Sequence, residues 1–157
     1  MSKDNYKIIA QNKRAKYEYF IEDEYEAGIV LEGSEIKSIR TGKVNIEDSF
    51  IEFDKNGELF LINSYIAPYK LATIFNHEAK RKRKLLLNKR EINKIIGKIK
   101  LKGLTCVPLV LYINSKNFAK IKIAVVKGKK LYDKRESIKE RDFQREKAML
   151  LKERFIK

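Results

Sequence analysis

Four carboxylates within five positions are the first candidates for chemistry: Glu22, Asp23, Glu24 and Glu26. Carboxylate oxygens that converge can hold magnesium, and such an ion supports phosphodiester hydrolysis. Consecutive carboxylates in a turn more often face water. A metal-dependent nuclease is therefore a minor alternative, and no metal site is predicted.

The other candidates for catalysis are isolated from one another. His77 is the only histidine and Cys106 the only cysteine, so the two cannot build a usual zinc site of about four ligands. Cys106 lies in an apolar stretch and fits a small core residue better than a nucleophile. No glycine-rich phosphate-binding motif is present. We expect a protein that is not an enzyme and needs no cofactor.

The basic residues indicate a polyanionic partner. The 157-residue chain has 36 Lys and Arg against 21 Asp and Glu, a formal net charge of +15. Five cations follow one another at residues 80–84, and residues 79–102 hold eleven bases against Glu91. Such a cluster favours phosphates, so nucleic acid is preferred to an anionic membrane. Nearby aromatic side chains could stack on RNA bases: Tyr17, Tyr19, Tyr69, Phe75 and Tyr132.

No segment of the sequence predicts insertion into a membrane or secretion. The apolar runs are far shorter than the roughly 18 residues of a transmembrane helix. The first residues lack the apolar region of a secretory signal. One cysteine allows no intramolecular disulfide, which favours a reducing compartment. We expect a soluble cytoplasmic protein without a membrane partner.

Short strands must position these side chains. Alternating apolar residues predict a strand over residues 16–21, and an apolar run predicts another over 27–31. Residues 49–53 and 58–62 flank Asn56-Gly57, which predicts a hairpin. A strand over residues 105–113, a turn over 114–117 and a strand with apolar residues at 121, 123 and 125 follow.

Two helices are expected beside the strands. Ser34 is predicted to cap a short helix that reaches Arg40. Asn88 is predicted to cap a longer helix with isoleucines at i, i+3, i+4 and i+7, which Gly103 ends. A small antiparallel β-barrel would bury such strands without leaving edges. We therefore expect residues 1–127 to form a mainly β domain with flanking helices.

Residues 128–157 are expected to form a separate, basic C-terminal tail. The composition favours helix, but the apolar residues follow no clean heptad. A lone helix of this kind is marginal in water, so we expect a tail that is disordered when free and orders on a partner. A terminal helix packed on the barrel is the alternative.

Eight short segments, taken in order along the chain, carry a family resemblance. They are NKRA at 12–15, YFI at 19–21, YEAGI at 25–29, GSEIKSIR at 33–40, GKVN at 42–45, DS at 48–49, RKLLLNKREI at 83–92 and KGKKLYDKR at 127–135. Together they resemble the SmpB family of SsrA-binding proteins, which partner transfer-messenger RNA (tmRNA) in bacterial trans-translation. The resemblance runs from about Asn12 to the C-terminus.

The resemblance implies a fold and a function. The fold is an oligonucleotide-binding-type antiparallel β-barrel with flanking helices. The barrel binds the tRNA-like domain of tmRNA, and the tail enters the decoding centre and empty mRNA channel of a stalled ribosome, where it is helical. The complex rescues the ribosome and tags the nascent peptide for degradation. Elongation factor Tu is a partner only through the charged RNA, and the protein is expected to be a monomer.

The resemblance also implies site residues. The RNA-binding set on the barrel is Asn12, Lys13, Arg14, Tyr19, Glu26, Lys37, Arg83, Lys84 and Leu86. The ribosome-contacting set on the tail is Lys129, Lys130, Tyr132, Asp133, Lys134, Arg135, Leu150 and Leu151. Arg83 and Lys84 suit phosphate contacts. A carboxylate such as Glu26 is repelled by RNA unless it accepts hydrogen bonds from base amines or sugar hydroxyls, and its alternative role is to pair with a nearby Lys or Arg.

The main alternative function keeps the same basic barrel and tail. A ribosomal or ribosome-assembly protein would bind ribosomal RNA without preference for a tRNA-like fold. A membrane-surface protein is disfavoured, because the tail has no strongly amphipathic pattern.

Overall fold

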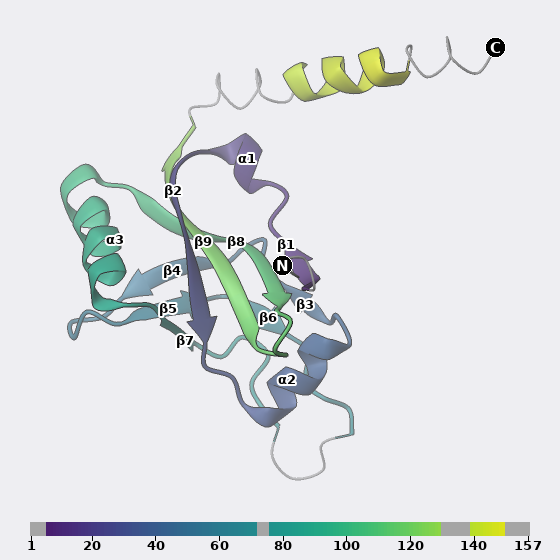
Figure 1. The fold of residues 1–157 in the computed structure, drawn as a ribbon, viewed down its shortest axis with the longest axis vertical. Coiled ribbons are helices and arrows are strands. Elements are labelled where there is room, and N and C mark those ends of the chain that lie inside the picture. Colours follow the sequence, from purple (N-terminus) through teal and green to yellow (C-terminus); the bar gives the residue numbers. More distant parts are fainter. Residues whose placement is uncertain (1–5, 72–75, 130–138, 150–157) are drawn as a thin grey trace.

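A seven-stranded antiparallel sheet forms the body of the protein (Figure 1). The computed structural model describes residues 6–71, 76–129 and 139–149. The strand order is β1-β8-β9-β2-β7-β5-β4. The strands are β1 (Lys7–Gln11), β2 (Tyr19–Ile29), β4 (Phe50–Phe53), β5 (Leu59–Ile62), β7 (Arg83–Leu86), β8 (Thr105–Ile113) and β9 (Ala119–Gly128). A separate small ladder pairs β3 (Val44–Asn45) with β6 (Tyr65–Ile66).

The sheet curls on itself without closing. The last strand of the order, β4, lies against β8, which is second in the order. No ladder among the described residues joins β4 to β1, so the barrel stays open at this seam. The prediction of a mainly β, barrel-like fold with flanking helices is confirmed, and the barrel is open rather than closed.

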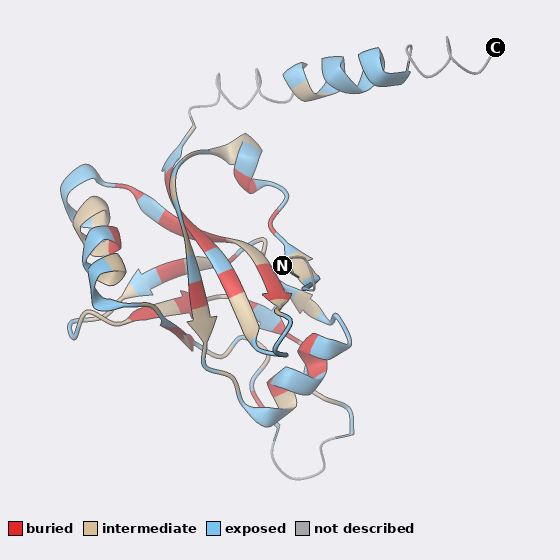
Figure 2. Ribbon diagram, viewed as in Figure 1, coloured by how far each residue is buried: buried red, intermediate tan, exposed pale blue. Residues whose placement is uncertain are grey.

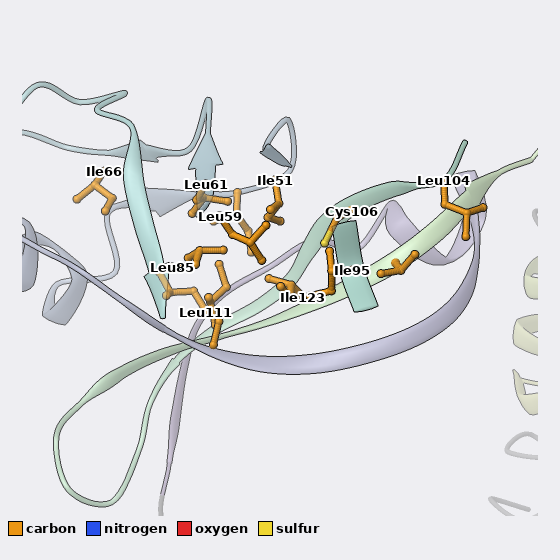
Figure 3. Close-up of a cluster of buried hydrophobic side chains, with 14 of the residues drawn as sticks. Ile51, Leu59, Leu61, Ile66, Leu85, Ile95, Leu104, Cys106, Leu111 and Ile123 are labelled. Atoms are coloured by element: carbon orange, nitrogen blue, oxygen red, sulfur yellow. The ribbon is translucent and has the colours of Figure 1, made fainter. Parts of the chain in front are cut away.

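A core of isoleucine, leucine and valine fills the inside of the curled sheet (Figure 2). Figure 3 shows side chains from β4, β5, β7, β8 and β9 converging there, with Ile95 entering from α3 (Lys89–Lys102). Cys106 is fully buried among them, and burial raises the pKa of its thiol to about 12. Cys106 is therefore a core residue, as predicted.

The acidic run occupies a strand and not a turn. Residues 19–29 form one continuous strand, β2, because β9 pairs with it from Tyr19 to Gly28. The predicted break between two strands was therefore wrong. The predicted start was also wrong, because residues 15–18 form the short helix α1 (Ala15–Glu18). Along β2 the carboxylates of Glu22, Glu24 and Glu26 are exposed, whereas Asp23 is half-buried and pairs with Lys98 of α3.

Local signals correctly predicted the β4–β5 hairpin and helix α3, whereas β1, β3, β6 and β7 were not predicted. The hairpin between β4 and β5 turns at Gly57, whose φ of 75° suits glycine. The Asn88 side chain accepts the Glu91 N–H at 2.9 Å to cap α3, and Gly103 ends it in the left-handed conformation. Helix α2 (Gly33–Arg40) is capped by Glu32 and not, as predicted, by Ser34. Glu32 and Glu35 form a capping box there, so each side chain bonds the other's backbone N–H.

The described part of the tail is one helical stretch, residues 139–149. Its residues are exposed apart from half-buried Arg141, and Figure 1 shows the stretch beyond α1. The Arg141 guanidinium lies 4.6 Å from the centroid of the Tyr17 ring. Ordering of the tail on a partner stays a prediction.

Candidate nucleic-acid interface

The segment from Asn12 to Tyr19 joins β1 to β2 and borders a pocket of about 440 Å³. Asn12 is 8% exposed, and its side-chain amide donates to the Pro108 carbonyl at 3.1 Å. Its Oδ1 is buried without a hydrogen-bond partner among the described residues. Lys13 is exposed at the rim. Asn12 therefore braces β1 against β8 and presents little surface to a ligand.

Arg14 and Tyr19 lie at the two ends of α1. The Arg14 guanidinium pairs with Asp48 at 2.8 Å and with Glu47 at 3.7 Å, and its side chain is half exposed. Tyr19 packs against the small apolar cluster that includes Val107. Arg14 retains exposed donors for RNA, whereas Tyr19 is largely committed to packing.

Glu26 projects from the exposed face of β2, and its partner is a tyrosine. The Tyr112 hydroxyl donates to the Glu26 carboxylate, and the Tyr6 ring lies 5.2 Å from the Tyr112 ring. Burial and the neighbouring carboxylate both raise the pKa of Tyr112, so the phenol keeps its proton and remains a donor. The second oxygen of Glu26 has no hydrogen-bond partner among the described residues. The alternative role of Glu26, pairing with a nearby Lys or Arg, is not seen among the described residues.

Leu86 lies beside Glu26 on the same face of the sheet. It ends β7 opposite Gly28, two residues along β2 from Glu26, so the side chains share a face. A Cβ at position 28 would lie 3.4 Å from the Leu86 Cβ, in van der Waals contact, so Leu86 lies against β2 here. Leu86 is 52% exposed at a groove of about 400 Å³. The groove is also lined by Val30, Ile36 and Phe118, which are exposed too.

The cationic run at residues 80–84 divides into two sets. Lys80 and Lys82 are exposed, and Lys82 Nζ lies 4.2 Å from the centre of the Phe60 ring. Half-buried Lys84 pairs with Glu58 at 3.2 Å. The two arginines turn inward instead. The expectation that the whole run faces phosphates is therefore wrong.

Arg83 is fully buried and does not contact the surface. Its Nε donates to Glu35 Oε2 at 2.5 Å, and its other nitrogens donate to Ser64 and to carbonyls of residues 78 and 79. Arg81 donates to the other Glu35 oxygen at 2.5 Å. The prediction that Arg83 contacts a phosphate was wrong, because every donor group on its guanidinium is bonded inside the protein.

Glu35 is held ionised in this interior site. Burial would raise the pKa of its carboxyl, but the hydrogen bonds and charges of Arg81 and Arg83 outweigh burial and lower the pKa. Buried His77 lies nearby, with its Nδ1 2.8 Å from the Ser34 hydroxyl and its Nε2 2.9 Å from the Ile66 carbonyl. These groups join α2 to β6 and β7, so they build the frame under the interface.

Lys37 and Lys129 are the remaining predicted residues that the structure describes. Lys37, on α2, lies 5.4 Å from the centre of the Tyr69 ring. The Lys129 N–H donates to the Glu18 carbonyl at 2.8 Å, and Lys129 Nζ lies 4.9 Å from the Phe20 ring centre. The other predicted tail residues lie outside the described residues: Lys130, Tyr132, Asp133, Lys134, Arg135, Leu150 and Leu151.

Sequence reasoning missed Tyr112, Phe118, Phe20 and Glu35. Alternation along the strands could have placed Tyr112 across the sheet from β2, but the hydrogen bond to Glu26 spans 86 residues. Phe118 directly follows a turn, and no sequence pattern around it indicated a role at the surface. No group of three or more His, Cys, Asp or Glu residues that could hold a metal occurs within the described ranges. No helix in those same ranges is long and apolar enough to cross a membrane.

Comparison with known proteins identifies the family. The model of the SmpB protein family matches residues 9–153. An SsrA-binding protein of Wolbachia sp. subsp. Drosophila simulans (strain wRi) is 58% identical over 145 residues, which cover 92% of this chain and 97% of that protein. An SsrA-binding protein of Orientia tsutsugamushi (strain Ikeda) is 55% identical over 153 residues, which cover 97% and 99%.

A solved structure agrees with these relatives. It is described as "tmRNA-SmpB: a journey to the center of the bacterial ribosome" and aligns with a TM-score of 0.65 at 46% identity. The alignment covers 82% of this chain and 92% of the solved chain. Both the fold and the sequence therefore lead to the same conclusion: this chain belongs to the SmpB protein family.

Proposed function

We propose that this protein binds tmRNA and acts with it on the bacterial ribosome in trans-translation. The relatives are SsrA-binding proteins, and the solved relative is a tmRNA–SmpB structure of the ribosome. The geometry that supports the proposal is the placement of Glu26 and exposed Leu86 on one face of the sheet, with Leu86 opposite Gly28. Neither side chain can bind a phosphate, so the pair suits bases and sugars of a particular RNA fold.

Some residues of this interface provide specificity for the RNA, and others provide affinity. Glu26, fixed by Tyr112, accepts hydrogen bonds from base amines or sugar hydroxyls, and Leu86 contacts a base or ribose. Lys13, Arg14, Lys37 and Lys84 supply charge toward phosphates around them. Asn12, Tyr19 and Arg83 support this surface from beneath.

The proposed division of the chain is a barrel domain over residues 1–127 and a tail over 128–157. The tail occupies the decoding centre and the empty mRNA channel, where it is helical. The Lys129 backbone N–H bonds to Glu18 of the barrel domain, so the first residues of the tail are still joined to the barrel. Such a protein is a monomeric binding protein and not an enzyme. It works in the cytoplasm, and elongation factor Tu reaches it only through the charged RNA.

A competition gel shift at physiological salt tests the RNA preference. A labelled tRNA-like domain of tmRNA is bound by the full-length protein and challenged with excess ribosomal RNA fragments and excess ordinary tRNA. We expect the complex to survive both competitors. Displacement by ribosomal fragments as readily as by the unlabelled domain would favour the alternative, a ribosomal or ribosome-assembly protein.

Deletion of residues 129–157 tests the division of the chain. The barrel retains Glu26 and Leu86, so the shortened protein should bind the tRNA-like domain with unchanged affinity. Peptide tagging in a reconstituted translation reaction should be abolished. Loss of RNA binding in the shortened protein would contradict the proposed division.

A further inference from the structure

The tail leaves the barrel beside α1, and Lys129 is bonded to that helix. The Lys129 N–H donates to the Glu18 carbonyl at 2.8 Å, directly after the end of β9. The Lys129 ammonium donates to the Lys16 carbonyl at 3.1 Å and lies 4.9 Å from the centre of the Phe20 ring. The tail therefore starts in a direction that α1 and Phe20 set.

A second contact joins the tail to α1 further along the chain. We call residues 139–149 the tail helix, and Figure 1 shows it beyond α1. The Arg141 guanidinium of this helix lies 4.6 Å from the centre of the Tyr17 ring. Tyr17 belongs to α1, next to Lys16, whose carbonyl bonds Lys129. Two separate segments of the tail therefore meet the same short helix.

Arg141 differs from every other residue of the tail helix. It is half-buried, whereas the rest of residues 139–149 are exposed. A guanidinium over an aromatic ring is attracted by the ring quadrupole, and loss of water around the cation strengthens this attraction. Arg145, about one turn further along, is exposed and makes no ion pair or ring contact with any described residue. The contact with Tyr17 is therefore particular to Arg141 and does not follow from the basic composition alone.

Exposed carboxylates of β2 favour a basic segment at this end of the sheet. Glu22 and Glu24 follow α1 on β2, and their side chains make no ion pair or hydrogen bond with any described residue. Glu24 borders the same pocket as Tyr17. Residues 129–157 hold eleven bases against six acids, so charge attracts the tail toward the surface on which Arg141 rests.

We propose that α1 is a docking surface for the tail of this same chain, and that the tail occupies it in the protein without RNA. Lys129 fixes where the tail starts, and Arg141 closes a latch on the Tyr17 ring. The latch gives the tail helix a preferred position on the barrel, where the sequence alone predicts disorder. It also covers a face of Tyr17, so this ring is not free to stack on RNA while the latch is closed. The inference concerns the protein alone and does not depend on which RNA it binds.

Paramagnetic broadening of NMR signals in the full-length protein tests the latch. A nitroxide is attached to Ala148→Cys, an exposed position about two turns from Arg141. Cys106 is the only native cysteine and is fully buried, so it remains unlabelled. We expect the backbone amides of α1 to broaden much more than those of α2, which lies at another edge of the sheet (Figure 1). No selective broadening at α1 would overturn the inference.

A matched pair of substitutions identifies the contact. Arg141→Gln and Arg145→Gln each remove one positive charge from the tail helix and retain a good helix former. Loss of the cation–π contact should lower the ratio of docked to free tail, and with it the broadening at α1, about two- to fivefold in Arg141→Gln. Arg145→Gln should retain most of the broadening. Equal losses in the two variants would mean general charge attraction and no latch at Tyr17.

Tyr17→Leu tests the other side of the contact. Leu is apolar and has no ring face, so this variant should lose as much broadening at α1 as Arg141→Gln. Unchanged broadening in Tyr17→Leu would contradict the latch. The amide signals of α2 should keep their positions, which checks that the barrel is intact.

A mixing experiment separates docking within one chain from docking between copies. Nitroxide-labelled protein without isotope is mixed with nitrogen-15 protein that carries no nitroxide, and α1 should then show little broadening. Broadening in the mixture equal to that within the labelled chain would mean that the tail docks on a second copy, and the proposal would be wrong. Failure of the wild-type protein to bind the tRNA-like domain would overturn the proposed function and not the latch.

Discussion

Glu35 and Glu26 are two carboxylates in a strongly basic chain, and the structure places them in opposite settings. Glu35 is fully buried, and two arginines bond both of its oxygens. Glu26 is exposed, and one tyrosine hydroxyl bonds one of its oxygens. The first carboxylate has its acceptors satisfied by the protein and can only hold the fold together. The second retains an acceptor for a ligand, so it can recognise RNA.

The largest expected effect is on stability, from Glu35→Ala. The substitution leaves the buried Arg83 guanidinium without a counter-charge, which costs about 3–5 kcal/mol. Urea denaturation followed by circular dichroism measures the free energy of unfolding. Glu47→Ala is the control, because Glu47 pairs with Arg14 at the surface and should cost less than about 1 kcal/mol. Equal losses for the two variants would show that the buried network is not a stabilising unit.

Acid should produce a smaller effect through the same group. The arginines lower the folded-state pKa of Glu35 below its ordinary value of 4.5. Its contribution is therefore fully present above about pH 4.5 and is lost as the pH falls through the lowered folded pKa. Urea denaturation between pH 7 and pH 3 should show a steeper acid loss in wild type than in Glu35→Gln, which cannot titrate there. Parallel curves would remove Glu35 from the acid response.

The network also shows where sequence reasoning reached its limit. The Asn56-Gly57 hairpin and the α3 cap at Asn88 were predicted correctly. Each of these features depends only on residues that are close together in the sequence. Arg83 was wrongly assigned to RNA. Its true partner, Glu35, is 48 positions away in the sequence, so no local pattern indicated the ion pair. The sequence of the five cations does not show which of them turn inward. Arg81 and Arg83 do so only because Glu35 of α2 lies against β7 in the folded protein.

The candidate site divides in the same way. Glu26 and Leu86 were predicted through the family resemblance, and the structure places them on the same face of the sheet, with Leu86 opposite Gly28. The continuity of β2 was missed, because four acids resemble a turn until β9 supplies hydrogen-bond partners on one side. Tyr112 was missed, because its relation to Glu26 exists only after β8 and β2 join the same sheet.

The exposed carboxylate should matter for binding and not for folding. Glu26→Ala is expected to weaken binding to the tRNA-like domain about tenfold, since hydrogen bonds to a charged group contribute about 1.5–3 kcal/mol. Removal of a negative charge would by itself strengthen binding to RNA, so a loss of affinity identifies a specific contact. The exposed Glu52→Ala variant on β4 is the matched control, with equal or higher affinity expected. Gel shifts at fixed moderate salt measure both, and unchanged affinity in Glu26→Ala would refute the assignment.

The smallest expected effect comes from Tyr112→Phe, which removes only the hydroxyl that orients Glu26. The ring and its contact with Tyr6 remain, so the fold should persist. Binding should weaken about two- to fivefold, because an unfixed Glu26 must be ordered on the RNA at a cost of about 0.5–1 kcal/mol. A double-mutant cycle with Glu26→Ala decides how Tyr112 acts. If it acts by positioning Glu26, the double variant binds no more weakly than Glu26→Ala alone, whereas additive losses would mean that Tyr112 contacts the RNA itself.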